Sequence, residues 1–180
     1  MGLGKKKMSS LARDEFVADA LAKYEGPLVG YAAGIVRDND RARDVVQDTF
    51  IRLYAQDLEK VSKGLKSWLY TVCRNRALDV LRKEGRAIVM DEEGFAKEES
   101  SDLSPRAMAD LDERMAQVVS CLDKLSDNQK EVIRLKFQQG MSYKEICEVT
   151  GLTMGNVGFL IHTGLKRMRS LLPDDLLEEI

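Results

Sequence analysis

The sequence predicts an all-α protein made of two small helical domains. Apolar residues recur at three- and four-residue spacing along most of the chain, which is the period of a helix buried on one face. Strict alternation of apolar and polar residues is missing, and runs of β-branched residues are short. No Asn-Gly or Asp-Gly pair marks a hairpin turn. These observations favour helices throughout and argue against a sheet.

The distribution of charge predicts the domain boundaries. The formal net charge is only -2, but residues 91–113 hold nine acidic and two basic residues, whereas residues 1–90 carry a basic excess. The acidic stretch is also poor in apolar residues, so it cannot form a core of its own. We therefore predict one domain over residues 1–90, an acidic flexible linker over 91–113, and a second domain over 114–180.

Composition also excludes several classes of protein. No apolar run approaches the roughly 20 residues that span a bilayer, and the first residues lack the apolar segment of a secretory signal, so we expect a cytoplasmic protein without membrane insertion. Three widely spaced cysteines suggest neither a disulfide framework nor a metal site, and no cofactor motif is present. A single histidine and the lack of a Gly-rich phosphate loop argue against an enzyme.

The first domain is expected to contain a series of amphipathic helices. The first covers about Ser10–Tyr24, and Gly26–Pro27 then interrupts or restarts it. Asn39 or Asp40 is expected to cap the next helix, which runs to about Gln56.

A long helix is predicted over about Ser67–Lys83, after a loop at about 61–66. It lies in the densest positive patch of the chain, because seven Lys or Arg residues occur between Lys63 and Arg86. Such a patch suits a polyanion such as nucleic acid, although each cation alone can serve only solubility.

The second domain is expected to begin with a helix over about 114–125, followed by two further capped helices and a final long one. The residues that mark their boundaries are the capping boxes Ser126 with Gln129 and Ser142 with Glu145, the closing glycines Gly140 and Gly151, and the cap Thr153. A short helix, a turn and a longer helix form the pattern of a helix-turn-helix unit, whose second helix commonly enters the major groove of DNA. Any small three-helix bundle can have the same pattern of caps and turns.

The last helix, from Thr153 to about Leu172, has an unusual composition for a helix that binds DNA. Its expected core stripe consists of Val157, Ile161, Leu165 and Met168. Its first two turns contain no basic residue, and its cations are confined to the C-terminal turns.

Three stretches follow one another along the chain: RARDVVQDTFIRLY, LKSWLYTVCRNRALDVLRKEGR and LDKLSDNQKEVIRLKFQQGMSYKEICEVTGLTMGNV. In this order they resemble region 2.2, regions 2.3 and 2.4, and region 4 of the extracytoplasmic-function group of bacterial RNA polymerase sigma factors, within the sigma-70 family. The resemblance spans most of the chain. It implies a transcription initiation factor whose region 2 and region 4 domains bind core RNA polymerase and promoter DNA.

For region 2, the resemblance implies two surfaces. Asp44, Gln47 and Asp48 are expected to face the clamp helices of the polymerase β′ subunit, although a merely solvated face is the alternative. Asn75 is expected to line a pocket for a flipped base of the -10 element, because an amide both donates to and accepts from base edges. The other residues expected at the -10 element are Trp68, Arg74, Arg76, Arg82, Lys83 and Arg86. Trp68 can stack on DNA or pack in the core.

For region 4, the resemblance implies contacts with the polymerase β flap and the -35 element. The residues expected to serve the -35 element are Thr153, Asn156, Phe159, His162, Lys166 and Arg167. Members of the family commonly carry basic residues where this chain has Gly158, Phe159, Leu160 and Thr163, so we expect a weaker or differently specified contact. Phe159 suits thymine methyl groups or an anti-sigma surface, and His162 suits a DNA contact or packing.

The resemblance further implies an anti-sigma factor as a partner. It places the acidic linker in the polymerase cleft, where it imitates nucleic acid in charge, although a plain tether has the same composition. The alternative function is a two-domain helix-turn-helix transcriptional regulator that binds duplex DNA without polymerase. The basic N-terminal half, which carries no signature of a ligand pocket, argues against that alternative.

Overall fold

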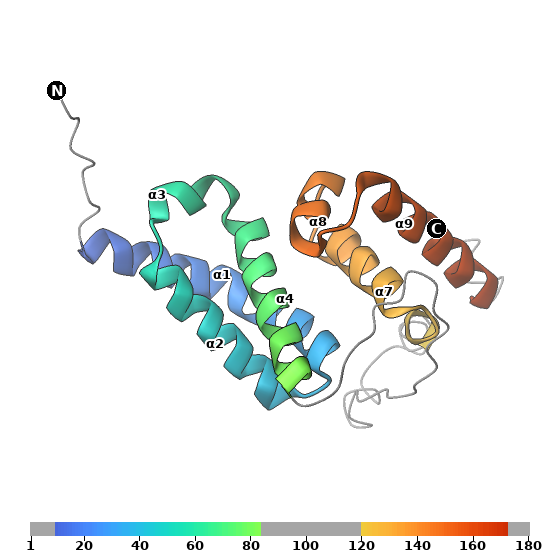
Figure 1. Cartoon of the computed structure of the whole chain (residues 1–180), viewed down its shortest axis with the longest axis horizontal. Helices are drawn as coiled ribbons and strands as arrows, with labels where there is room; N and C mark the ends of the chain where they lie inside the picture. The colour runs from blue at the N-terminus through green and yellow to red at the C-terminus, as the bar shows by residue number, and fades with distance from the viewer. Residues whose placement is uncertain (1–9, 84–119, 173–180) are drawn as a thin grey trace. The chain divides into compact units, whose positions relative to one another are not determined.

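The chain is described by a computed structural model over residues 10–83 and 120–172, and these residues form helices and turns without a strand. They belong to two compact units, which divide between residues 88 and 89 (Figure 1). The predicted all-α class with two helical domains is therefore confirmed. The predicted linker over 91–113 and the site residue Arg86 lie outside the described residues. None of the helices within the described ranges is long and apolar enough to cross a membrane.

The first unit is built on three long helices. They are α1 (Ser10–Val36), α2 (Asn39–Ala55) and α4 (Leu65–Lys83), with the short α3 (Leu58–Val61) before α4. Each long helix packs against the other two (Figure 1). Leu28 of α1, Leu53 of α2 and Leu69 of α4 are completely buried, and the rings of Tyr31 and Tyr70 meet with centroids 5.1 Å apart. The burial of these and similar apolar side chains is the main force that holds the unit together.

The first helix does not break at Gly26–Pro27, which corrects the expected interruption. α1 continues through Pro27 to Val36. Proline supplies no amide hydrogen for the carbonyl of Lys23 and its ring crowds that carbonyl, so a continuous helix here has a cost. Gly26 and Pro27 are exposed, whereas Leu28, Tyr31 and Ala32 on the following turns are buried against the unit. Tertiary packing on both sides of the proline therefore overrides the local signal.

The N-cap of α2 is Asp38, one residue before the expected Asn39 or Asp40. Its carboxylate Oδ1 accepts from the backbone N–H of Arg41 at 2.9 Å. The other end of α2 is closed from α1, because the guanidinium of Arg13 donates to the carbonyls of Tyr54 and Gln56. A cation at helix C-terminal carbonyls is favourable for both hydrogen bonding and the helix dipole.

The expected loop at about 61–66 is mostly helical. α3 is followed by a 3-10 turn over Ser62–Gly64, and α4 starts at Leu65, two residues earlier than predicted. Leu58 and Val61 are buried, so this connection is anchored to the unit by its own apolar side chains.

The second unit follows the predicted caps closely. Helical residues extend to Asp123, and α7 (Asp127–Ile133), α8 (Tyr143–Thr150) and α9 (Met154–Leu171) follow. Both predicted capping boxes form, and the Thr153 hydroxyl accepts from the Asn156 amide at 3.3 Å. Gly140 and Gly151 have positive φ angles of 61° and 77°, which L side chains rarely adopt. The predicted caps and closing glycines are thus confirmed residue by residue.

One turn of the second unit was not predicted. Residues Arg134–Gln138 extend α7 as a π-helical turn, in which the Gln139 amide donates to the Arg134 carbonyl. This turn leaves Phe137 exposed while Leu135 is fully buried. Wide turns of this kind are uncommon and often occur at functional surfaces.

The core stripe of α9 differs from the prediction in its C-terminal half, where Leu165 is exposed and Met168 is only half-buried. Val157 and Ile161 are buried as expected, but the next buried position is Gly164, whereas Leu165 is 41% exposed. A β-carbon at position 164 would lie only 2.7 Å from Cδ1 of Ile133. The glycine therefore allows α9 to approach α7 closely. The prediction of Leu165 as a core residue is wrong, because the helix directs this side chain away from the contact between α9 and α7.

Candidate nucleic-acid and partner interfaces

Asn75 occupies the outward face of α4. Trp68, Asn75 and Arg82 are spaced seven residues apart, so they follow one line along the helix. Asn75 and Arg82 are exposed and Trp68 is half-buried, whereas the opposite side of α4 carries Leu69, Cys73 and Ala77 in the core. An exposed amide, with an aromatic side chain two turns before it and a cation two turns after it, offers a face that can hydrogen-bond and stack on nucleic-acid bases and meet phosphates.

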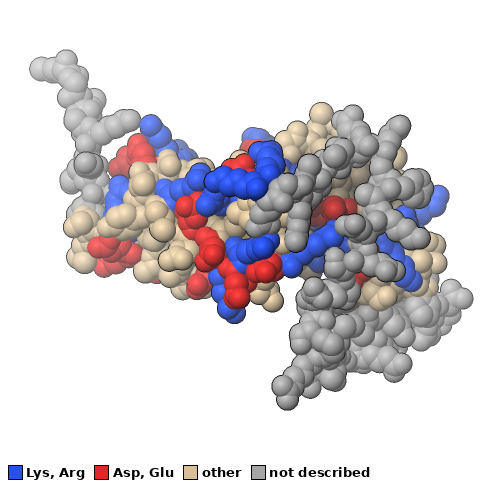
Figure 2. Space-filling view, turned by 60° about the horizontal axis from the view of Figure 1, so that its bottom comes forward, with Lys and Arg blue, Asp and Glu red and all other residues tan. Residues whose placement is uncertain are grey.

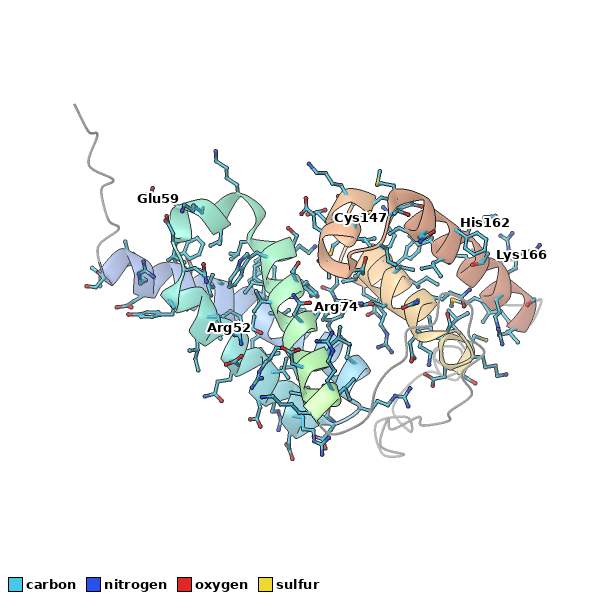
Figure 3. All side chains as sticks on the ribbon, viewed as in Figure 1. Arg52, Glu59, Arg74, Cys147, His162 and Lys166 are labelled. Atoms are coloured by element: carbon cyan, nitrogen blue, oxygen red, sulfur yellow. The ribbon has the colours of Figure 1, made fainter. Side chains whose placement is uncertain are left out.

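Two of the expected cations of α4 are placed differently from the expectation. Arg74, labelled on α4 in Figure 3, is only 7% exposed, so it offers little surface to a partner. Arg76 reaches across to α2, where its Nε lies 3.1 Å from Oδ2 of Asp48. That Nε is shielded from solvent and its N–H is not aimed well enough for a hydrogen bond. The sequence period alone cannot show this, because both arginines lie at the edge of the buried stripe.

The other described cations of α4 that were expected to bind DNA, Arg82 and Lys83, are exposed near its C-terminus. Arg82 pairs with Asp79 at 2.9 Å within the same helix, and Lys83 follows it. Figure 2 shows basic and acidic side chains interleaved on the visible face rather than a single basic field. Exposed pairs of this kind contribute little to stability, so these cations remain available to an anionic partner.

The outer face of α2 carries the residues expected to meet polymerase. Asp44 and Gln47 are exposed, and Asp48 is half-buried at the flank toward α4. The Asp48 carboxylate also accepts from Nε of Arg52 at 3.0 Å. Ile51, which the sequence reasoning passed over, is 61% exposed one turn after Gln47. It could have been found because it falls outside the inward stripe of Val45, Val46 and Leu53, and such an exposed apolar side chain suits a protein partner.

The outward face of α9 is unusually apolar at its N-terminal end. Phe159 is 66% exposed and Met154 is also exposed, whereas Leu160 is half-buried. His162 and Lys166 lie one turn apart on the exposed side (Figure 3). The other expected residues, Thr153, Asn156 and Arg167, are exposed as well.

Thr163 helps to fix α9 against α7. Its hydroxyl accepts from the Gln129 side-chain amide at 3.1 Å and donates to the Phe159 carbonyl at 2.8 Å. Gln129 also belongs to the capping box of α7, so one side chain links the start of α7 to the middle of α9. The polar contact and the glycine at position 164 together set the position of the second helix of the helix-turn-helix.

Within residues 10–83 and 120–172 no cluster of three or more potential metal ligands occurs. The three cysteines are free; Cys73 and Cys121 are buried and Cys147 is half-buried.

Comparison with known proteins assigns both units. Residues 21–87 match the family described as Sigma-70 region 2, and residues 115–168 match Sigma-70, region 4. The chain is 28% identical over 174 residues to RNA polymerase sigma factor SigV of Bacillus subtilis, a match that covers 96% of this chain and 99% of the relative. It is also 28% identical over 153 residues to ECF RNA polymerase sigma factor EcfG of Rhodopseudomonas palustris, covering 84% and 82% of the two chains.

A solved structure supports the same assignment. The chain is similar to the sigma factor RpoE of Bartonella quintana, which was solved in complex with the anti-sigma factor NepR. The TM-score is 0.63 and the sequence identity 27%, over 90% of this chain and 99% of that chain. With region 2 and region 4 matched in order and full-length relatives of one kind, this chain belongs to the extracytoplasmic-function group of the sigma-70 family of RNA polymerase sigma factors.

Proposed function

We propose that this sigma factor binds core polymerase through the outer face of α2 and holds an unstacked base of the -10 element on the outward face of α4. The protein is a transcription initiation factor, and its family consists of transcription factors rather than enzymes. The observation that carries the finer proposal is the exposed Asn75 amide, in line with Trp68 and Arg82 on a helix whose opposite side is packed.

The chemistry of promoter opening fits this face. A strand held apart from its partner exposes base edges, which need matched donors and acceptors, and phosphates, which need cations. The Asn75 amide provides one donor group and one acceptor group, while Arg82 and Lys83 provide exposed positive charge two turns further along α4.

Recognition of the -35 element is proposed to be the weaker half of promoter binding. α9 has no Lys or Arg before Lys166, so its first turns offer backbone amides, the Thr153 and Asn156 side chains and the apolar Phe159. Binding to duplex DNA depends strongly on phosphate neutralisation, and few cations therefore mean low duplex affinity.

The test is run-off transcription with purified core polymerase on a promoter library from the source genome. We expect promoter-specific transcripts and thymines in the melted strand that react with permanganate. Asn75→Ala should lower permanganate reactivity by about tenfold, the cost of one base contact, while leaving core binding unchanged. Asn39→Ala, which removes an exposed amide at the start of α2, is the matched control.

Two results would contradict the proposal. Unchanged permanganate reactivity in Asn75→Ala would remove Asn75 from base recognition. Binding to duplex sites without polymerase, together with no transcript on any promoter, would instead favour the helix-turn-helix regulator.

An anti-sigma protein is the third expected partner, as it is for the Bartonella relative. The exposed apolar side chains Met154 and Phe159 suit a protein surface. Run-off transcription that stays at full level when an anti-sigma protein from the same genome is added in excess would argue against that protein as the partner.

A further inference from the structure

We infer that Arg76 is a positioning residue that presents the Asp48 carboxylate to polymerase and fixes α4 beside Asn75, rather than a contact to DNA. The inference rests on the proposed function, because it assigns Asp48 to the polymerase surface. It changes the role of Arg76 from the one that its place in a basic segment suggests.

The first support is the geometry of the Asp48 side chain. Nε of Arg52, one turn along α2, and Nε of Arg76, from α4, both lie against Oδ2 at 3.0 Å and 3.1 Å. No contact within the described residues uses Oδ1 of Asp48. Two cations therefore hold one oxygen of the carboxylate, and the other remains to accept from a basic group on a partner.

The second support is the environment of Arg76. The Arg76 side chain is 30% exposed, and its Nε is shielded from solvent and lies 3.1 Å from Oδ2 of Asp48 on α2. Part of its charge is already balanced by Asp48, which reduces its value for a DNA phosphate. Arg82 and Lys83, which are more exposed, are better placed for that role.

The third support is the position of the pair in the sequence. Asp48 directly follows Gln47 on the outer face of α2, and Arg76 directly follows Asn75 on α4. The ion pair thus joins the helix proposed to bind polymerase to the helix proposed to hold the base, at the residues next to each site. A group that is held in its binding orientation loses less freedom on association, so this pair favours a prearranged polymerase contact.

The experiment measures the affinity of the full chain for core polymerase by fluorescence competition. The variants are Arg76→Gln, Asp48→Asn and the double variant, with Arg82→Gln as the matched control on the same helix. We expect Arg76→Gln to weaken core binding about fivefold or more, with the double variant no weaker than Asp48→Asn alone. Arg76→Lys should recover most of the loss because it restores the cation, and Arg82→Gln should bind as the wild type does.

A second readout separates this role from direct binding to a phosphate. Binding of the assembled holoenzyme to a single-stranded -10 oligonucleotide is measured as a function of salt. If Arg76 neutralised a phosphate, Arg76→Gln would reduce the slope of log K against log salt by about 0.7. We expect no such change, whereas Arg82→Gln should reduce the slope.

The inference is overturned if Arg76→Gln binds core polymerase normally, if the two substitutions add, or if the salt slope falls while core affinity is unchanged. Far-UV circular dichroism and thermal unfolding check that the variants are folded, and Arg76→Lys keeps the comparison valid if the glutamine variant is not. Failure of the proposed function is separate, because there the wild-type chain itself would give no promoter-specific transcript.

Discussion

Cys73 is a buried thiol in the core of region 2. It lies on α4 with no exposed surface, and burial raises its pKa from 9.0 to about 12. Burial also raises the pKa of its neighbour Tyr70. Since the folded chain holds the thiol proton more tightly than the unfolded chain, this group stabilises region 2 below about pH 9, and the contribution is lost as the pH rises toward 12.

The cysteines should therefore differ in reactivity. In the folded protein at pH 8, iodoacetamide should label Cys147 at least about tenfold faster than Cys73 or Cys121, because the thiolate is the nucleophile and burial blocks access. Mass spectrometry of peptides over time measures the rates, with the urea-unfolded chain as the control in which all three react alike. Rapid labelling of folded Cys73 would show that the core of region 2 opens readily.

Whether the role of a residue could be predicted depended on whether its contacts lie close to it in the sequence. Caps such as Ser126, Ser142 and Thr153, and the turn at Gly151, were predictable because each bond joins residues three or four positions apart. The pairing of Arg76 with Asp48 was not predictable, because it depends on which side of α4 meets α2. The sequence can place a residue on a helix more surely than it can place that helix against another.

At the scale of elements, the continuous α1 is strained at Pro27, and a substitution there can remove the strain. Pro27→Ala should stabilise the chain by about 1–2 kcal/mol, because alanine restores the amide hydrogen and removes the clash with the Lys23 carbonyl, less the entropy regained by the unfolded chain. Pro27 is exposed, so alanine leaves no cavity. Urea unfolding followed at 222 nm measures the change.

The control for this prediction is Ala18→Pro, which places a proline at an exposed interior position of α1. It should destabilise the chain by about 3 kcal/mol or more. A loss of stability in Pro27→Ala would mean that the proline fixes a bend on which the packing of α1 depends.

The apolar start of α9 leads to a prediction about affinity for duplex DNA. Phe159→Arg should raise affinity for duplex promoter DNA and make the slope of log K against log salt steeper by about 0.9, the effect of one added phosphate contact. The change is expected because Phe159 is exposed on the outward face of the recognition helix. Electrophoretic mobility shifts over a range of salt concentrations measure both quantities.

Phe137→Arg adds the same charge to another exposed aromatic position in region 4, on the π-helical turn rather than on α9. It serves as the control for nonspecific attraction. Equal gains in both variants would mean that the outward face of α9 has no special relation to DNA.

For the whole molecule, the two units should contribute unequally to promoter choice. Replacing the -10 element should reduce open complexes by about tenfold or more, which is the usual effect of a mismatched base in a specific site, while replacing the -35 element should reduce them only a few-fold. The reason is the exposed Asn75 on α4 and the lack of Lys and Arg in α9 before Lys166. Run-off transcription from paired mutant promoters measures the ratio, and a larger effect at -35 would reverse the proposed order.

The overall organisation was predictable because it depends on features that extend over long stretches of the chain. Two helical units and their family followed from periodic apolar residues and three ordered motifs, and the matches over residues 21–87 and 115–168 confirm them. The details that the sequence did not reveal, such as the continuity of α1 and the exposed Leu165, arise where packing between helices outweighs local preference.

The glycine at position 164 also limits how region 4 can change over time. Any larger side chain there must push Ile133 aside, so a basic residue cannot be added at this point of the helix without moving its neighbours. New charge can be gained more simply at Gly155, where a β-carbon meets nothing within 4 Å, or at Phe159. If α9 meets the -35 element as proposed, the positions at which this protein could gain a stronger contact lie in the first two turns of that helix.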